Sequence, residues 1–374
     1  MKKTELPSVL GSISPAEFMR KYWHKKPLLI RQAVPGMKPL LSRQALFAMA
    51  SQEGVESRLI TGDIQSNRWT FDHGPFKPRA LPPLKQSHWT LLLQGMDLHD
   101  EGVAALRDRF RFVPDARLDD VMISYATDGG GVGPHFDSYD VFLLQAHGQR
   151  RWRISPQKDL RLRQDLPLKI LKAFKPTQTW VLDPGDMLYL PPHYAHEGVA
   201  VGECMTYSIG FKAESPQSLA HELLPRLVDM GPEEPQARYA DPRQTATTHA
   251  AQIPAALQKF AHKAVLQALQ HPGDLNCALG EFLSEPKAQV WFEAQALPRT
   301  LKGLRLDRKS KMLYDDDFVF INGESWRCKG ADAKSLRLLA DQRFLEAAQV
   351  AKASPALKGL LQEWLQAGWL QIQK

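Results

Sequence analysis

Cysteine is scarce in this sequence. Its 374 residues include three cysteines, Cys204, Cys277 and Cys328, which are odd in number and far apart. This usage argues against a disulfide framework or a cysteine-rich zinc site, and it favours a reducing compartment. Long hydrophobic runs are missing too, since none approaches the ~18 apolar residues of a membrane span and no apolar segment follows the basic start. The sequence therefore predicts a cytoplasmic protein with no membrane association.

Internal repeats and low-complexity segments are also missing, and acidic residues are in the minority. The 48 Lys and Arg exceed the 41 Asp and Glu, which gives a net charge of +7. A basic protein is attracted to nucleic acid or to an acidic assembly such as the ribosome, although a generally basic surface explains the charge equally well. The basic residues recur along the chain and form no tail, so direct nucleic-acid binding is not favoured.

Strand patterns dominate the middle of the chain, after two predicted helices that begin after Ser14 and Ser42. The patterns are short, apolar or alternating, and turn formers such as 128–131 and 183–186 separate them. The predicted strands are 89–93, 121–125, 141–145, 150–154, 180–182, 187–190 and 205–211. Many short strands with such turns predict a barrel or a double-sheet jelly roll. We assign residues 1–212 to this domain.

The pattern changes to helical spacing at Ser215, and the chain ends in a small α+β part. Residues 213–285 form the helical segment, which either packs on the barrel or mediates dimerisation. In residues 286–374, Asn322–Gly323 separates two strand-like runs, which is the strongest short hairpin signal. Helices around one hairpin resemble a winged helix. Because no helix there carries a run of Arg and Lys, a protein-contact role is favoured over DNA binding.

The stretch from Gly129 to Asp140 carries the most chemical information. No Gly-Lys-Ser/Thr follows its glycines, so a nucleotide loop is a weak interpretation, whereas glycines let backbone pass close to a ligand. His135 and Asp137 come next, and residues two apart in extended backbone point to the same face. His-X-Asp alone is common by chance, and buried, hydrogen-bonded histidines are the structural alternative.

A second histidine downstream completes a facial triad of two histidines and one carboxylate, which leaves open positions on Fe(II). His193 and His196 are the candidates. His196 follows the Pro191–Pro192 bend and begins the next strand, so the spacing favours it. His193 lies in the bend itself, where it is expected to be a surface residue or to support the ligands without binding the metal.

Arg150 is the candidate for holding 2-oxoglutarate, the co-substrate that many such iron sites use. An arginine binds a carboxylate bidentately and stays charged in a buried pocket. Arg150 shares strand parity with Trp152, whereas Arg151 and Arg153 have the opposite parity. Ser124 adds a hydroxyl to the same pocket. The alternatives are three surface arginines on an edge strand and an ordinary strand serine.

These residues belong to motifs that resemble the bacterial ribosomal oxygenases, which are JmjC-type 2-oxoglutarate oxygenases of the cupin superfamily. The similarity is dense from about residue 15 to 212 and diffuse afterwards. Its motifs are YWHKKPLLIRQ (22–32), DVMIS (120–124), GGGVGPHFD (129–137), YDVFLLQ (139–145), RRWRI (150–154), DPGDMLYLPP (183–192) and HEG (196–198).

The resemblance implies a jelly roll, a helical dimerisation region and a winged-helix-like C-terminal domain. It implies that His135, Asp137 and His196 bind Fe(II), and that Arg150 and Ser124 bind 2-oxoglutarate. With O2 as the second co-substrate, the expected reaction is hydroxylation at Cβ of an arginine in large-subunit ribosomal protein sixteen. A homodimer is expected as well.

The residues that receive the substrate are less well marked. Tyr139 and Asp140 follow Asp137, and an aromatic ring and a carboxylate could replace the hydration of an arginine. The alternative is a tyrosine at a strand start and an aspartate in a turn. Three other functions stay open: histidine hydroxylation or lysine demethylation by the same core, a non-catalytic cupin scaffold, and a nucleic-acid binder built on the winged helix.

Overall fold

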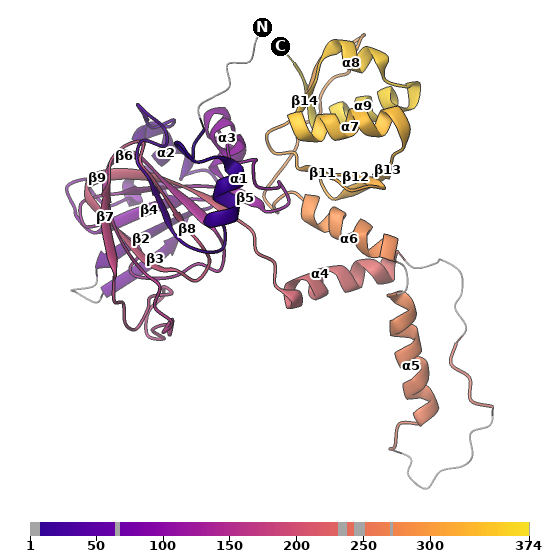
Figure 1. The fold of residues 1–374 in the computed structure, drawn as a ribbon, viewed down its shortest axis with the longest axis horizontal. Coiled ribbons are helices and arrows are strands. Elements are labelled where there is room, and N and C mark those ends of the chain that lie inside the picture. The colour runs from indigo at the N-terminus through magenta and orange to yellow at the C-terminus, as the bar shows by residue number, and fades with distance from the viewer. Residues whose placement is uncertain (1–7, 64–67, 231–237, 243–250, 270–271, 374) are drawn as a thin grey trace. The chain divides into compact units, whose positions relative to one another are not determined.

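The computed structural model describes residues 8–63, 68–230, 238–242, 251–269 and 272–373. The chain divides into two compact units, Met1–Ala213 and Glu214–Lys374. Figure 1 shows the large sheet in the first unit, and most of the helices together with a few short strands in the second. The division falls one residue from the boundary predicted at 212, while the boundary predicted at 285 stays a prediction.

The first unit is built on one curled antiparallel sheet. Within the described residues it has nine strands in the order β1-β8-β6-β9-β5-β4-β2-β3, and β7 pairs with β6. The strands are β1 (Leu28–Ile30), β2 (Ser57–Asp63), β3 (Arg68–His73), β4 (Trp89–Leu93), β5 (Leu118–Ala126), β6 (Val141–Ser155), β7 (Gln178–Leu182), β8 (Met187–Leu190) and β9 (Ala195–Phe211). The predicted barrel-like fold of many short strands is confirmed.

Three short helices cover one face of this sheet: α1 (Pro15–Lys21), α2 (Arg43–Met49) and α3 (Glu101–Asp108). The hydroxyls of Ser14 and Ser42 accept hydrogen bonds from the first turns of α1 and α2, as the cap signals predict. Along β5, Ile123 and Tyr125 join the large core under these helices, whereas Ala126 belongs to a separate small cluster. Strand alternation therefore gives the sheet a face toward the helices and an opposite face.

The strands predicted at 141–145 and 150–154 are one continuous strand, β6. Its register with β9 shifts between Gln145 and His147 and again between His147 and Gln149. Gly148 has a φ of 56°, and a Cβ there would lie 2.0 Å from the carbonyl oxygen of Glu203. The bulge interrupts the alternation of side chains without ending the strand, which is why the sequence reads as two segments. The β2–β3 hairpin was not predicted at all.

The second unit combines helices with two small sheets. Its elements are α4 (Pro216–Asp229), α5 (Ala255–Ala268), α6 (Pro272–Ser284), β10 (Leu304–Leu306), β11 (Met312–Tyr314), β12 (Phe318–Ile321), β13 (Glu324–Arg327), α7 (Gly330–Gln342), β14 (Phe344–Leu345), α8 (Ala347–Lys352), α9 (Pro355–Gln366) and β15 (Leu370–Ile372). The sequence also predicts a Pro- and Glu-containing loop from about 231 to 243, and part of this range lies outside the described residues. Within the described helices, none combines the length and the apolar character needed to cross a bilayer.

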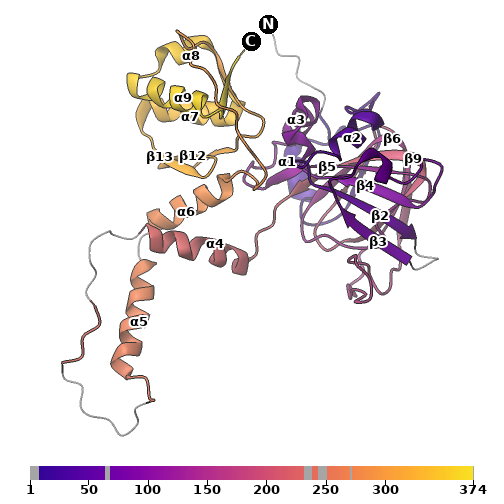
Figure 2. The ribbon, with the colours of Figure 1, turned by 180° about the vertical axis from the view of Figure 1, so that it is seen from behind.

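Strand β12 explains how this unit is held together. Phe318 and Phe320 pack in one cluster with Cys277 of α6, whereas Val319 and Ile321 belong to the core that α7 and α9 share. Figure 2 shows the hairpin strands between α6 and the α7–α9 layer. The predicted hairpin is confirmed, because β12 and β13 pair on either side of Asn322–Gly323, and both turn residues have positive φ, 53° and 91°.

Candidate functional site

The loop after β5 lies alongside β9 and places the first candidate ligands. Backbone hydrogen bonds join Gly129 N to Ala200 O (3.0 Å) and Ala200 N to Gly130 O (2.9 Å). Two more join His135 and His196, from N to O in each direction, at 2.9 and 2.8 Å. The loop thus pairs with the edge of β9 that faces away from β6. This pairing brings His135 and His196, which are 61 positions apart in the sequence, opposite each other.

The glycines allow this close approach. A Cβ on Gly130 would lie 2.4 Å from the carbonyl oxygen of Trp89, and one on Gly131 would lie 2.6 Å from that of Gly198. Gly133 has a φ of 76°, a left-handed conformation that glycine adopts without strain. The run of glycines therefore serves close backbone packing beside the candidate ligands.

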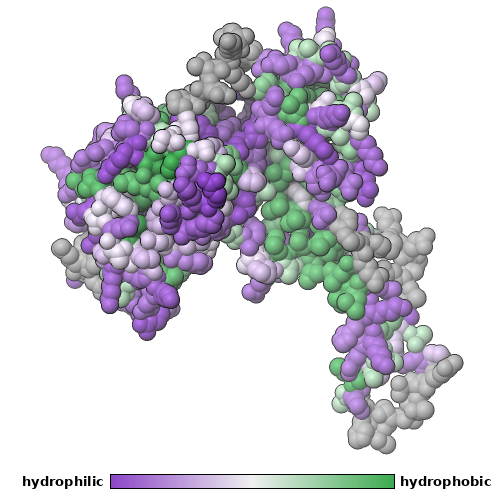
Figure 3. All heavy atoms as spheres, in the orientation of Figure 1, coloured by the Kyte–Doolittle hydropathy of each residue, from purple (hydrophilic) through white to green (hydrophobic). Residues whose placement is uncertain are grey.

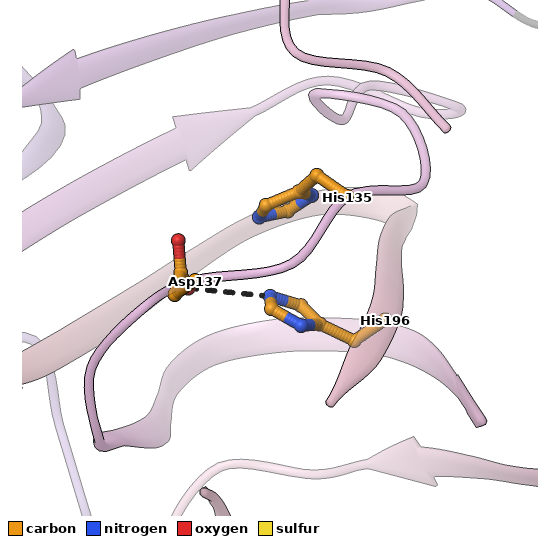
Figure 4. Close-up of side chains that lie close together, drawn as sticks. All are labelled: His135, Asp137 and His196. Carbon is orange, nitrogen blue, oxygen red and sulfur yellow. Dashed lines mark ion pairs between the residues drawn. The ribbon is translucent and has the colours of Figure 1, made fainter. Parts of the chain in front are cut away.

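His135, Asp137 and His196 converge on one point (Figure 4). Each offers a ligand atom, and these atoms lie within 4.8 Å of one another. Nε2 of His196 is 3.6 Å from Oδ2 of Asp137, and the two imidazole centroids are 4.2 Å apart. Among the residues that the structure describes, no other group of three His, Cys, Asp or Glu has this geometry.

Each imidazole is held in one tautomer by a hydrogen bond between its Nδ1 and a backbone carbonyl oxygen. Nδ1 of His135 lies 2.9 Å from the carbonyl oxygen of Gly133, and Nδ1 of His196 lies 2.8 Å from that of Tyr194. Because a carbonyl oxygen only accepts hydrogen bonds, each Nδ1 carries the proton. Each Nε2 is left with a free lone pair, which is the state that binds a metal ion.

The electrostatics of His196 also suit a ligand. Burial lowers its pKa to about 4, with a further contribution from neighbouring His135, while Asp137 opposes the fall. The imidazole is therefore neutral at physiological pH, and no proton has to leave before a cation binds.

Arg150 and Trp152 face the same side of the sheet as His196. In the pairing of β6 with β9, Arg150 lies opposite Ala200 and Trp152 opposite Gly198. Arg150 is 5% exposed, yet its Nε and one of its Nη atoms have no hydrogen-bond partner in the described part of the chain. Buried guanidinium groups are rarely left so, because the cost of desolvation is not repaid.

The other predicted contributor is Ser124. Ser124 of β5 is buried, and its hydroxyl donates to the carbonyl oxygen of Thr206 at 3.3 Å. Arg153, of opposite parity to Arg150, pairs with Glu197. Arg151 is exposed. Of the three arginines in this run, Arg150 is thus the one whose charge is buried and lacks an anionic partner in the described residues.

His193 lies outside the group of candidate ligands. It has a positive φ of 60°, its side chain is exposed, and its ring centroid is 5.7 Å from that of Phe136. Its backbone N–H donates to the carbonyl oxygen of Asp137 at 2.7 Å. The residue contributes to the turn beside the site through its backbone.

Asp140 is expected to contact the substrate, but the structure turns its side chain into the protein interior. Its side chain is fully buried, and it accepts a hydrogen bond from the Tyr189 hydroxyl at 2.5 Å. Nε2 of His24 is 3.0 Å away, and a guanidinium nitrogen of Arg117 is 3.7 Å away. Burial raises the pKa of Asp140, while Tyr189 and His24 oppose that rise. Asp140 instead ties the start of β6 to the N-terminal segment.

Tyr139 keeps 39% of its surface exposed. Its acidic neighbours include Asp120, which the sequence analysis did not identify. Partial burial and the negative charges of Asp137 and Asp120 raise the pKa of Tyr139. Asp120 is buried and accepts a hydrogen bond from the Gln94 amide at 2.8 Å. Strand alternation was the available signal, since Asp120 has the parity of Ser124 on β5.

Known proteins match both units. The sequence profile of the JmjC domain matches residues 105–219, and that of a ROXA-like winged helix matches residues 267–371. The chain is 34% identical over 282 residues, 73% of its length and 72% of the relative's, to the ribosomal protein uL16 3-hydroxylase of Escherichia coli K12.

Solved structures agree with this match over nearly the whole chain. The X-ray structure of E. coli ycfD has a TM-score of 0.83 and 28% identity, with 97% of this chain and 99% of that one covered. The E. coli ribosomal oxygenase YcfD in complex with cobalt and 2-oxoglutarate has a TM-score of 0.82 and 27% identity at the same coverage. The predicted JmjC fold with a C-terminal winged helix is confirmed, and the chain belongs to the JmjC-domain ribosomal oxygenase family of the uL16 3-hydroxylase.

Proposed function

We propose that this protein is a cytoplasmic, Fe(II)- and 2-oxoglutarate-dependent oxygenase that hydroxylates an arginine side chain, at Cβ, of ribosomal protein uL16. The observation that carries the proposal is the convergence of His135, Asp137 and His196 on the same sheet face as a buried arginine whose nitrogens lack a partner in the described residues. The E. coli relative is named for 3-hydroxylation of uL16, and a related structure holds cobalt and 2-oxoglutarate.

The donor set fits Fe(II). Two imidazoles and one carboxylate on one side of the ion leave the other positions open for a co-substrate and oxygen. When bound, the iron supplies oxygen activation coupled to decarboxylation of 2-oxoglutarate. The chain's own contribution is geometric: the carbonyl oxygens of Gly133 and Tyr194 hold both Nε2 atoms toward the ion.

The far carboxylate of 2-oxoglutarate suits Arg150, with the Ser124 hydroxyl nearby. A dicarboxylate that reaches from the metal toward Arg150 runs along β9, from His196 to Ala200, a span of ~13 Å at about 3.3 Å per residue. That span accommodates both the co-substrate and the arginine side chain. The unpaired nitrogens of Arg150 would then gain the anionic partner that their burial calls for.

For the substrate, we propose the exposed part of the Tyr139 ring as the contact, with the negative charge of the buried Asp120 close to it, in place of Asp140. A guanidinium group that enters the site loses its hydration, and an aromatic face and a carboxylate compensate for that loss. Gly210 lies between the two residues: a Cβ there would be 3.9 Å from the Tyr139 ring and 4.0 Å from the Asp120 backbone. Since this protein is itself basic, its net charge does not attract a cationic side chain, and such local groups have to provide the recognition.

The substrate assignment is tested on ribosomes from cells that lack this protein. Incubation with enzyme, iron and 2-oxoglutarate should add the mass of one oxygen atom to uL16, on a single arginine located by tandem mass spectrometry. Omission of 2-oxoglutarate is the control. Oxidation of a histidine, or of another ribosomal protein, would refute the substrate while leaving the cofactor assignment intact.

The metal ligands are tested by substitution. Asp137→Ala and His196→Ala should each lower the affinity for Mn(II), a stand-in for Fe(II), by more than the ~10–100-fold cost of losing a supporting residue. His193→Ala is the matched control and should retain the affinity. Electron paramagnetic resonance of free Mn(II) measures binding, and circular dichroism checks the fold. Loss of binding in His193→Ala with none in His196→Ala would reverse the assignment.

Arg150→Ala should raise the concentration of 2-oxoglutarate needed for turnover by more than ten-fold, since breaking a buried charged pair costs ~2–5 kcal/mol. Mn(II) affinity should stay within two-fold of the wild type's, because the metal ligands are untouched. Arg151→Ala, on the same strand with opposite parity, is the control. Succinate release at varied 2-oxoglutarate gives the measurement, and an unchanged requirement in Arg150→Ala would place the anchor elsewhere.

We also propose that the protein is a homodimer, joined through the helices that follow Ser215. Apolar side chains stay exposed there, including Leu224 and Val228 of α4 (47% and 68%) and Val265 and Leu266 of α5 (61% each). Figure 3 shows hydrophobic atoms gathered over α4 and α6. Exposed apolar patches of this kind mark contact surfaces between proteins.

Light scattering tests the dimer. The full chain should have the mass of a dimer at roughly micromolar concentration, because burial of the apolar helix faces favours association. A fragment that ends at Lys212, which lacks those helices, should be monomeric. Val228→Glu in the full chain should shift the mass toward the monomer. A monomeric full chain would contradict the proposal.

A further inference from the structure

Trp152 occupies a place that the opposite strand leaves open for it. The residue lies on β6 across from Gly198 of β9, and it is 5% exposed. A Cβ on Gly198 would lie 2.7 Å from Cη2 and Cζ3 of the indole. Any side chain on that glycine would displace the ring, so the backbone of β9 determines where the indole lies.

Along the paired strands β6 and β9, the indole lies between Arg150, the proposed co-substrate anchor, and His196, a proposed metal ligand. The Arg150 guanidinium carbon is 5.9 Å from the Trp152 ring centroid, within the range of a cation–π interaction. On its other side, the Trp152 ring centroid is 5.9 Å from that of His196. One rigid side chain therefore contacts both the proposed co-substrate anchor and a proposed metal ligand.

Three nitrogen atoms in this row are buried without a hydrogen-bond partner in the described residues. They are Nε1 of Trp152 and the Nε and one Nη of Arg150. Since roughly 90% or more of buried polar groups are paired in native proteins, three unpaired donors on neighbouring side chains call for an acceptor from outside the chain. The Ser124 hydroxyl differs, because it already donates to the backbone at Thr206.

We propose that Trp152 is a co-substrate-binding residue whose indole N–H donates a hydrogen bond to the distal carboxylate that Arg150 holds. The inference rests on the proposed 2-oxoglutarate chemistry and adds a third donor to it. A carboxylate has two oxygens and about four acceptor positions, enough for the guanidinium and the indole together. The ring also supports the guanidinium plane, so Trp152 sets the direction from which Arg150 meets its ligand.

A purely structural role for the indole makes a different prediction. An N–H bonded to a buried water would leave 2-oxoglutarate affinity unchanged when the nitrogen is removed. Under our proposal, the affinity depends on the nitrogen, and it does so only for ligands that carry the distal carboxylate. Pyruvate has the 2-oxo acid group that binds the metal but no distal carboxylate, so it separates the two cases.

The test compares wild type and Trp152→Phe, both loaded with Zn(II), by calorimetry. The affinity of Trp152→Phe for 2-oxoglutarate should fall by about ten-fold or more, as expected for a lost hydrogen bond to a charged group. Its affinity for pyruvate should equal the wild type's. Trp180→Phe is the matched control, because Trp180 pairs with Trp152 across β6 and β7 and packs in the same apolar cluster; it should bind both ligands normally.

A second measurement does not depend on how the variant packs. In wild-type protein labelled with ¹⁵N-tryptophan, the indole signal that disappears in Trp152→Phe should shift on addition of 2-oxoglutarate and stay in place with pyruvate. Equal 2-oxoglutarate affinity in wild type and Trp152→Phe, an equal loss for pyruvate, or an unmoved signal would each overturn the role of Trp152. Failure of the wild type to bind 2-oxoglutarate would overturn the proposed function with it.

Discussion

The backbone pairing between the loop after β5 and strand β9 is the interaction on which the candidate site depends. It sets His135 against His196, and it carries Asp137 to the same point two residues later. The pairing needs backbone atoms closer than a Cβ would allow, as at Gly131, so the glycines and the ligands form one structural unit. The site is thus built on a sheet, whose hydrogen bonds leave its ligands little freedom.

Because side chains alternate along each strand, the two faces of the sheet have different roles: one forms the apolar core and the other carries the candidate site. The face under α1–α3 carries large aromatic side chains such as Phe142 and Tyr189, which supply most of the apolar burial. The opposite face carries Arg150, Trp152 and His196 with small neighbours, Ala126 and Ala200 among them. On the second face, the Arg150 guanidinium and the Trp152 indole nitrogen are buried without a hydrogen-bond partner in the described residues, which costs free energy. The apolar packing on the first face provides the stability that offsets this cost.

Asp140 shows how sequence proximity to a site misleads. It lies three residues from Asp137, and its charge and position suggested a receptor for a cationic substrate. Its side chain instead points into a buried network with Tyr189 and His24, because neighbouring residues at the start of a strand face opposite sides. The acidic group beside Tyr139 is Asp120, which precedes it by 19 positions and arrives there through the pairing of β5 with β9.

The sequence by itself determined what is local. The caps of α1 and α2, the Asn322–Gly323 hairpin and most strand segments follow from the rules of backbone conformation and alternation, which act over a few residues. Parity along β6 likewise singled out Arg150 over Arg151. Tertiary structure decided what depends on distant partners: the bulge that makes β6 one strand, the β2–β3 hairpin, the burial of Asp140, and the unpaired nitrogens of Arg150 and Trp152. Burial and hydrogen-bond pairing depend on residues that are far apart in the sequence. A local sequence pattern therefore identifies only one of the two partners in each contact.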